Sequence, residues 1–282
     1  MPFPKRQAAL LALFLPPIFL CVAAMRPTLA QRFASLLEAQ ADLHPAPTPA
    51  ILTVADIKWL PAPVQRYVTQ SGALGRPIPW DMRLEFDAVL RKRPGSPDIP
   101  GGTQQLNYFD PPTRSFTMKA RMWGLPVSVL HHYADDEASM EVRVLGLFDA
   151  VDVHGKQLFQ AECVTVLNDW CIYAPGRLSD PRLAWKALDA KRAEVAFSNR
   201  GVTVKAVLHF NERGELVDFV SDDRLALQDD GSLKGFRFST PLGDYQDFGG
   251  MRLARKGEAV WHYPEGDFAY GSFTLKKVEY NR

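Results

Sequence analysis

Apolar and polar residues alternate most clearly between Lys191 and Gln228. Two turns, Asn199-Arg200-Gly201 and Asn211-Glu212-Arg213-Gly214, divide this stretch, and Asn and Gly tolerate the left-handed backbone of tight turns. Successive side chains of a strand point to opposite faces of a sheet, so the alternation gathers the apolar residues on one face. The pattern predicts a three-stranded antiparallel meander with one solvent face and one packed face, built from Ala193–Phe197, Val202–Leu208 and Leu216–Val220.

Similar alternation begins at Trp80 and covers most of the remaining chain. A spacing of about 8–12 residues per strand is typical of all-β sheets and barrels, and a sheet of about a dozen strands must curl, split or close. We therefore expect a mainly β (α+β) protein: a large curved antiparallel sheet or half-barrel with two or three packed helices. The meander would lie in the middle of the sheet, and residues 53–282 would form a single domain. The further strands are predicted at Met82–Leu90, Thr103–Phe109, Arg114–Met122, Val127–Tyr133, Ala138–Leu145, Phe148–Val153, Gly235–Thr240, Gly243–Gly249, Met251–Tyr263 and Asp267–Glu279.

Helical spacing interrupts the strands between Gly155 and Tyr173, where Phe159, Cys163, Val166 and Trp170 recur on one face. On a helix, Cys163 and Cys171 would lie ~12 Å apart, whereas a disulfide needs Cα atoms within about 7 Å. The helix therefore predicts two buried thiols. Two short strands in the same place would instead allow a disulfide in an exported protein.

Two shorter helices are predicted before the first strand. Thr53 and Asp56 have the spacing of a capping box, and Pro61 and Pro63 end the first of these helices near Leu60. A second short helix then runs to Ser71-Gly72. Such helices usually cover one open end or face of a sheet.

Residues 1–30 have the pattern of a signal peptide or an N-terminal membrane anchor. Lys5 and Arg6 precede an uncharged run over residues 8–24, which as a helix would span ~25 Å, just short of a ~30 Å hydrocarbon core. Ala24 and Ala30 each end a small-residue pattern that a signal peptidase accepts. The alternative is a buried apolar helix of a cytosolic protein.

Residues 31–52 are predicted to form a helix and a proline-rich linker between this leader and the β domain. If residues 8–24 enter the membrane, residues 31–282 lie outside the cytoplasm. The protein would then be anchored to an inner membrane or secreted to a periplasm.

The overall charge is nearly balanced, with 33 basic and 32 acidic residues and a formal net charge of +1. Nucleic-acid binding needs a basic surplus gathered on one face, so we expect no nucleic-acid partner. The charge pattern points to no particular protein partner.

Candidate catalytic groups are few. His131-His132, followed by Asp135 and Asp136, is the only dense cluster among the six histidines, and neighbours on a strand point to opposite faces. The sequence holds no His-Glu-x-x-His, Cys-x-x-Cys or Gly-x-Ser-x-Gly motif. We therefore predict no metal site and no cofactor, and take His131, Asp135 and Asp136 as the catalytic candidates. The alternative is a strand end followed by an acidic turn.

Aromatic and apolar side chains on the predicted strands are numerous enough to line a concave sheet. If helices fill that concave face incompletely, an apolar pocket remains for a lipid or another apolar small molecule. If they fill it completely, the same residues form an ordinary core. The residues predicted to bind such a ligand are Phe86, Tyr108, Phe116, Met118, Phe197, Phe210, Phe219 and Trp261.

The segment LPAPVQRY, from Leu60 to Tyr67, resembles the opening of an uncharacterised bacterial family, a domain of unknown function that often carries an N-terminal membrane segment. The resemblance extends to about Tyr280. Asp136 and Ala138 depart from it, because the family pattern has glycines after Tyr133. The layout also resembles the half-barrels of lipoprotein carriers, in which an open sheet wraps helices and shelters acyl chains; this likeness is at the level of the fold. The other matching segments are DPPTRSF (Asp110–Phe116), Met140 with Leu145–Leu147, Trp170–Pro175, Trp185 with Asp189, and Gly250-Met251 with Trp261 and Tyr280.

These observations favour an envelope protein that binds a lipid or other apolar ligand in a curved-sheet pocket. Two alternatives stay open. One is an enzyme acting on an envelope substrate, and the other is a structural or interaction module at the membrane.

Overall fold

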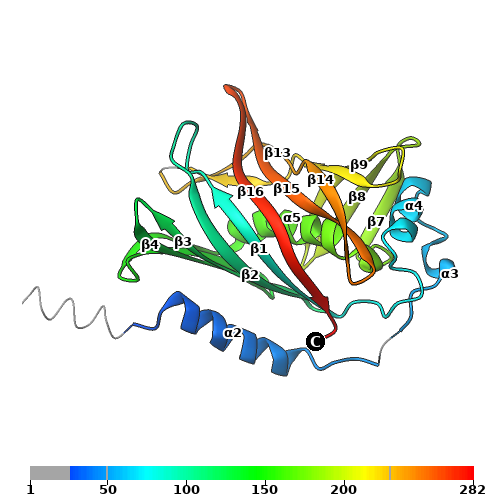
Figure 1. The fold of residues 1–282 in the computed structure, drawn as a ribbon, viewed down its shortest axis with the longest axis horizontal. Helices are drawn as coiled ribbons and strands as arrows, with labels where there is room; N and C mark the ends of the chain where they lie inside the picture. The colour runs from blue at the N-terminus through cyan, green and yellow to red at the C-terminus, as the bar shows by residue number, and fades with distance from the viewer. Residues whose placement is uncertain (1–25, 49, 229) are drawn as a thin grey trace, which may run out of the picture.

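The computed structural model describes residues 26–48, 50–228 and 230–282. Its helices and strands alternate with short turns, as Figure 1 shows. The helices are α2 (Leu29–Leu43), α3 (Val54–Ile57), α4 (Ala62–Gln70), α5 (Lys156–Tyr173) and the 3-10 turn η1 (Pro175–Arg177). The strands are β1 (Asp81–Leu90), β2 (Ile99–Phe109), β3 (Pro112–Met122), β4 (Leu125–Ala134), β5 (Glu137–Val144), β6 (Phe148–His154), β7 (Leu183–Ala187), β8 (Arg192–Asn199), β9 (Val202–Phe210), β10 (Leu216–Ser221), β11 (Leu225–Leu227), β12 (Leu233–Gly235), β13 (Arg237–Ser239), β14 (Leu242–Phe248), β15 (Met251–Tyr263) and β16 (Gly266–Tyr280).

Most strands belong to one 14-stranded antiparallel sheet with the order β6-β5-β4-β3-β2-β1-β16-β15-β13-β10-β9-β8-β7, and β14 pairs with β15. β11 and β12 form a separate hairpin. The sheet is not closed, because β6 and β7 remain its two edges. These findings confirm the predicted mainly β fold with a large antiparallel sheet.

The meander β8–β10 lies toward one edge of the sheet, so its predicted place in the middle is wrong. The centre is the pair β1–β16, which joins the first and last strands of the chain; Leu84, for example, is opposite Val278. This pairing links segments about 190 residues apart in sequence. Local alternation carries no information about such a contact.

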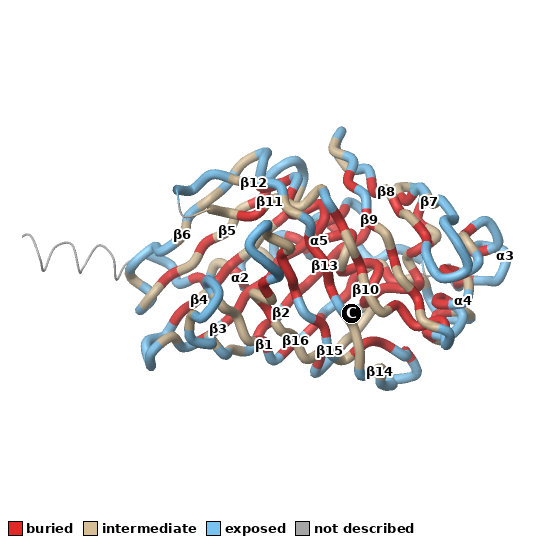
Figure 2. Tube along the Cα trace, turned by 90° about the horizontal axis from the view of Figure 1, so that it is seen from above, coloured by how far each residue is buried: buried red, intermediate tan, exposed pale blue. Residues whose placement is uncertain are grey.

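Helix α5 lies within the curve of the sheet, as Figure 1 shows. The buried positions in Figure 2 concentrate around it. Thirteen of its 18 residues are buried. Its C-terminal carbonyls are satisfied from elsewhere: the Tyr67 hydroxyl donates to Cys171 O at 3.0 Å and Ile172 O at 3.1 Å, and the Tyr280 hydroxyl donates to Tyr173 O. The Leu60–Tyr67 segment that suggested the family therefore has a structural role at the end of α5.

The helical reading of residues 155–173 is confirmed, and Cys163 and Cys171 are buried free thiols. The predicted short helices also form: Thr53 and Asp56 make the capping box of α3, and Pro61 precedes α4. One hairpin, β11–β12, has no counterpart among the predicted strands.

Helix α2 packs on the opposite face of the sheet from α5. Leu130 of β4 is buried against Leu29 and Phe33 of α2, whereas its neighbour His131 approaches α5. The helix predicted within residues 31–52 is therefore present, and it begins slightly earlier, at Leu29. Within the described ranges, no helix combines the length and apolar character needed to cross a bilayer. The predicted leader run, residues 8–24, lies outside those ranges.

Candidate functional site

A cavity of about 160 Å³ lies between α5 and the concave face of the sheet. One wall is aromatic and aliphatic and comes from β1, β3, β13, β15 and β16. These side chains carry no hydrogen-bond donor or acceptor, so this wall favours an apolar occupant. It is formed mainly by Phe86, Leu90, Phe116, Phe238, Ala259 and Phe273.

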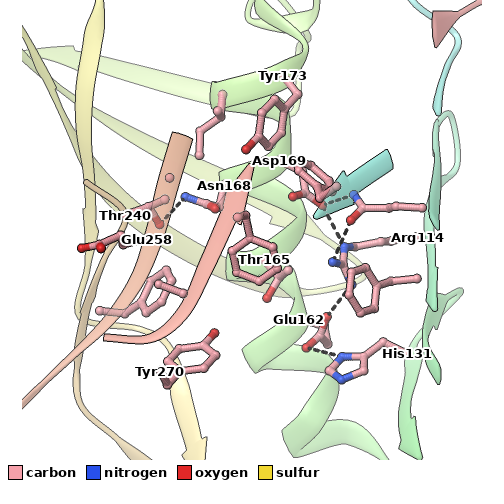
Figure 3. Close-up of a pocket in the computed structure, with 18 of the residues that line it drawn as sticks. Arg114, His131, Glu162, Thr165, Asn168, Asp169, Tyr173, Thr240, Glu258 and Tyr270 are labelled. Carbon is pink, nitrogen blue, oxygen red and sulfur yellow. Dashed lines mark hydrogen bonds and ion pairs between the residues drawn. The ribbon is translucent and has the colours of Figure 1, made fainter. Parts of the chain in front are cut away.

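The opposite wall is polar because α5 presents one stripe of its surface there. Glu162, Thr165 and Asp169 recur at intervals of three and four residues, which places them on the same side of a helix. Asn168 also lines the cavity, and its amide donates to Thr240 Oγ1 at 3.1 Å. The close-up in Figure 3 shows this row facing strands on both sides. The cavity is therefore apolar on the sheet side and polar on the helix side.

Arg114 of β3 holds the polar wall together. Its Nε donates to Asp169 Oδ2 at 2.8 Å, its Nη2 donates to Gln105 Oε1 at 3.0 Å, and its Nη1 lies 3.5 Å from Glu162 Oε2. Gln105 in turn donates to Asp169 Oδ2 at 2.8 Å. All four residues are buried. A buried guanidinium needs such partners, because an unpaired charge in the interior is strongly destabilising.

Glu162 remains ionised in this setting. Burial alone would raise the pKa of its carboxyl, but His131, Arg114 and Arg224 oppose that effect and lower the pKa from 4.5 to about 2. His131 Nδ1 lies 3.6 Å from Glu162 Oε1. A carboxylate with so low a pKa is a weak base, and beside an imidazole it can orient the ring and stabilise positive charge on it. Among the described residues that line the cavity there is no serine or cysteine to act as a nucleophile.

Arg224, just before β11, also lines the cavity. Its guanidinium lies over Phe238, with 4.0 Å to the ring centroid, and within 6 Å of the Trp261 and Tyr270 centroids at 5.4 and 5.9 Å. No carboxylate of the described residues lies within ion-pair distance of it. The aromatic rings therefore position this guanidinium beside the cavity.

Two buried polar atoms on the helix side have no hydrogen-bond partner: Glu162 Oε2 and Thr165 Oγ1. The contact between Glu162 Oε2 and Arg114 Nη1, at 3.5 Å, is an ion pair and not a hydrogen bond. Leaving such atoms unsatisfied costs about 1–3 kcal/mol each. The two atoms therefore favour an occupant with a hydrogen-bond donor at this wall.

The structure does not bring the three catalytic candidates together. His131 lines the cavity, whereas Asp135 is exposed in the β4–β5 turn, 3.4 Å from Arg200, and Asp136 is exposed beside it. His131 and His132 do point to opposite faces, because His132 Nδ1 contacts Ser115 Oγ at 3.0 Å. The residue grouped with His131 is Glu162, which is distant in sequence. No cluster of three or more metal-binding side chains occurs in the part of the chain that the structure describes.

Of the eight predicted ligand-binding residues, Phe86 and Phe116 line the cavity. Met118 is buried in a neighbouring apolar cluster, and Tyr108 stacks on His44 with 4.1 Å between ring centroids. The other four belong to the main core: Phe197, Phe210, Phe219 and Trp261.

Sequence reasoning missed the polar residues of the site, which include Gln105, Arg114, Glu162, Asp169 and Arg224. One signal was available. Glu162, Thr165 and Asp169 form a polar stripe within a run of residues that is otherwise apolar enough to be buried on all sides. Arg114 and Arg224 gave no such signal, because a single arginine near a strand is usually solvent-exposed.

Fold and cavity together define an open antiparallel-sheet protein with a central helix and a half-polar cavity beside it. The chain belongs to a family of unknown function, DUF6544, whose model matches residues 50–273. The resemblance noted from Leu60 onward is thereby confirmed. No sequence match was found among proteins of curated function.

Three solved structures have a related layout. A putative outer membrane lipoprotein-sorting protein domain from Vibrio parahaemolyticus is 9% identical with a TM-score of 0.41, and the match covers 71% of this chain and 85% of that one. A DUF1329 family protein from Desulfovibrio piger is 9% identical with a TM-score of 0.44, covering 82% and 94%. A LolA superfamily protein from Nitrosomonas europaea is 10% identical with a TM-score of 0.41, covering 77% and 93%. The first of these is described as a lipoprotein-sorting domain, and the likeness of this chain to it concerns the fold alone.

Proposed function

We propose that this protein binds an apolar molecule with a polar end in the cavity between α5 and the sheet. The observation that carries the proposal is the division of the cavity into an aromatic wall and a buried polar wall. Apolar groups of the ligand would lie against Phe86, Phe116 and Phe273. The polar end would lie against α5.

The unsatisfied atoms of the polar wall define that end more closely. A hydroxyl, amide or protonated acid could donate a hydrogen bond to Glu162 Oε2 and contact Thr165 Oγ1. An acceptor on the same group could face Arg224, whose guanidinium has no carboxylate partner among the described residues. A plain hydrocarbon would leave Glu162 Oε2 and Thr165 Oγ1 without a hydrogen bond and would offer Arg224 no acceptor, so we expect it to bind less tightly.

The cavity volume limits how much of a ligand is enclosed. A cavity of roughly 150 Å³ lined by apolar side chains holds one benzene-sized molecule, and the present cavity measures about 160 Å³. A whole diacyl lipid is much larger. The enclosed part would be one ring, or one end of a chain, with its polar group.

The leader pattern supports a place for this activity in the cell envelope. Residues 8–24 carry no charge and follow Lys5 and Arg6, as in signal peptides and membrane anchors. On this proposal residues 31–282 lie outside the cytoplasm, attached to the membrane or free in a periplasm, and meet apolar ligands there.

The test is to purify the full chain from a bacterial envelope and identify bound small molecules by native mass spectrometry and solvent extraction. We expect a co-purifying apolar molecule at up to one per chain. Ala259→Phe, which fills the cavity from β15, should remove it. Ala184→Phe, at an exposed position of β7, is the matched control and should retain it.

The proposal fails if the wild-type chain is consistently empty, or if both variants retain the molecule equally. Circular dichroism of each variant shows whether the fold is intact. A different result would support catalysis by the His131–Glu162 pair. In that case the wild-type chain would release a chemically altered molecule, and His131→Gln would release the same molecule unaltered.

A further inference from the structure

Four large apolar side chains are exposed at two neighbouring hairpin tips, β3–β4 and β5–β6. Trp123 is 75% exposed and Phe148 is 60% exposed, with Leu125 and Leu145 at 42% and 43%. Leu145 N donates to Pro126 O at 2.9 Å, so the two tips lie side by side. These four residues are called the tip patch below. Monomeric proteins seldom expose adjacent large apolar side chains without a contact that covers them.

The backbone at both tips makes this choice of residues unusual. Trp123 and Leu145 have positive φ values of 52° and 58°, and each precedes a glycine that also has positive φ, Gly124 or Gly146. The β3–β4 turn has two residues, Trp123 and Gly124, and the β5–β6 loop has three, from Leu145 to Leu147. Turn positions with positive φ favour Asn, Asp or Gly. A bulky side chain there costs conformational energy and stays largely exposed, at 75% for Trp123 and 43% for Leu145. The tip patch is therefore better explained by an external contact than by folding.

Basic side chains flank the tip patch. Arg93 in the β1–β2 loop shares a surface hollow with Trp123, and Arg121, two residues before Trp123, is exposed. The acidic side chains at this end are paired: Asp98 with Arg91 at 2.7 Å, and Asp149 with Arg26 and Arg143 at 2.8 Å each. The charge available to a partner at this end is therefore positive.

The N-terminal segment is held at the same end of the sheet. Besides the Arg26–Asp149 pair, Pro27 O accepts a hydrogen bond from Arg143 Nη1 at 2.8 Å. Asp149 directly follows Phe148 of the tip patch. Arg26 and Pro27 therefore lie beside the exposed apolar side chains, and in the sequence the uncharged run of residues 8–24 ends two positions before Arg26.

We propose that the tip patch rests on the surface of a lipid bilayer that contains anionic lipids. Trp and Leu side chains would enter the interfacial region, where aromatic residues concentrate, and Arg93 and Arg121 would contact lipid phosphates. A buried apolar cluster that includes Phe116, Met118 and Val129 extends toward Met122 and Val144, which directly precede the two tips. Since Phe116 and Val129 also line the cavity, this apolar face connects the cavity with the proposed membrane contact.

The test uses the full chain in vesicles of phosphatidylethanolamine and phosphatidylglycerol that contain lipids brominated near the headgroup, which quench nearby tryptophan fluorescence. We expect Trp123→Phe to remove the larger part of the lipid-quenched emission. Trp59→Phe is the matched control, because Trp59 is 52% exposed and belongs to the α3–α4 segment. It should leave the quenched emission unchanged.

Replacing phosphatidylglycerol by phosphatidylcholine should weaken the quenching of Trp123. The double variant Arg93→Glu with Arg121→Glu should weaken it as well.

Equal loss of quenched emission in both tryptophan variants, or no loss in Trp123→Phe, would overturn the proposal. So would protection of Trp123 from aqueous iodide without quenching by the brominated lipids, because protein, such as a second copy of the chain, would then cover the tip patch. The measurement is independent of cavity binding: an empty cavity with a quenched Trp123 rejects the ligand proposal alone.

Discussion

Helix α5 has two sides with opposite character. On the side of β8–β10, Trp170 packs against Phe197 with 5.2 Å between ring centroids, and both side chains are fully buried. On the side of β1–β4, Glu162 and Asp169 face Arg114 and a cavity remains. The first side is called the dry side below and the second the cavity side.

The difference shows which side of α5 is close-packed and which side instead carries buried charges and a cavity. The dry side gains stability from close contact of large rings, which bury much apolar area and leave no space. The cavity side carries buried charges that need mutual partners, and it forgoes the contacts that a filled core would give. Since folding alone would favour filling this space, the cavity side is the part of the fold to test for function.

The largest expected effect is on the dry side. Phe197→Ala should lower the free energy of unfolding by about 3–5 kcal/mol, because it removes a fully buried ring and leaves a void beside Trp170. Urea denaturation of the purified chain measures it. Leu188→Ala, at a position 39% exposed, is the control and should change the free energy of unfolding by about 0.5 kcal/mol or less. A small effect of Phe197→Ala would mean that the dry side is loosely packed.

Arg114→Met tests the cavity side. It leaves the buried carboxylates of Glu162 and Asp169 without their shared cation, so we expect a loss of about 3 kcal/mol in the free energy of unfolding. In the same denaturation experiment, the triple variant with Glu162→Gln and Asp169→Asn should recover part of that loss. If Arg114→Met alone is neutral, the carboxylates are not held by this ion pair.

The pH dependence of stability should differ between the two sides. The folded-state pKa of Glu162 is about 2, below its ordinary value of 4.5, so the unfolded state binds the proton more readily. The stabilisation by this group is therefore complete above pH 4.5 and is lost as the pH falls from 4.5 toward 2. Its size is about 3 kcal/mol. Denaturation curves between pH 7 and pH 3 should show a smaller decline for Glu162→Gln than for the wild type, whereas Phe197→Ala should keep the wild-type decline.

The smallest expected effect concerns the chemical reactivity of the two buried thiols. Burial raises the pKa of Cys163 to about 12 and also raises that of Cys171, so neither forms a thiolate at neutral pH. A maleimide reagent at pH 7 should label neither thiol in the folded chain and both after denaturation, as peptide mass spectrometry can show residue by residue. Rapid labelling of Cys171 in the native chain would show that the C-terminal part of α5 becomes exposed to solvent.

The local sequence was sufficient for most helices and strands, although not for the short hairpin β11–β12. Alternation predicted the long strands β1, β3, β4 and β15, and helical spacing with Pro61 and Thr53 predicted α3, α4 and α5. These signals are strong because side-chain direction repeats every two residues in a strand and every 3.6 in a helix. The family resemblance at Leu60–Tyr67 was also readable from sequence, since it depends on residue order.

Only the tertiary structure decided which buried residues form a core and which line a cavity. Phe197 and Phe116 have the same apolar, alternating context in sequence, yet Phe197 meets Trp170 and Phe116 borders empty space. The partners Arg114 and Glu162 are 48 residues apart, and β1 meets β16 across nearly the whole domain. Periodicity records which face of an element is apolar. What that face meets depends on the curvature and strand order of the sheet, which arise from contacts between distant segments.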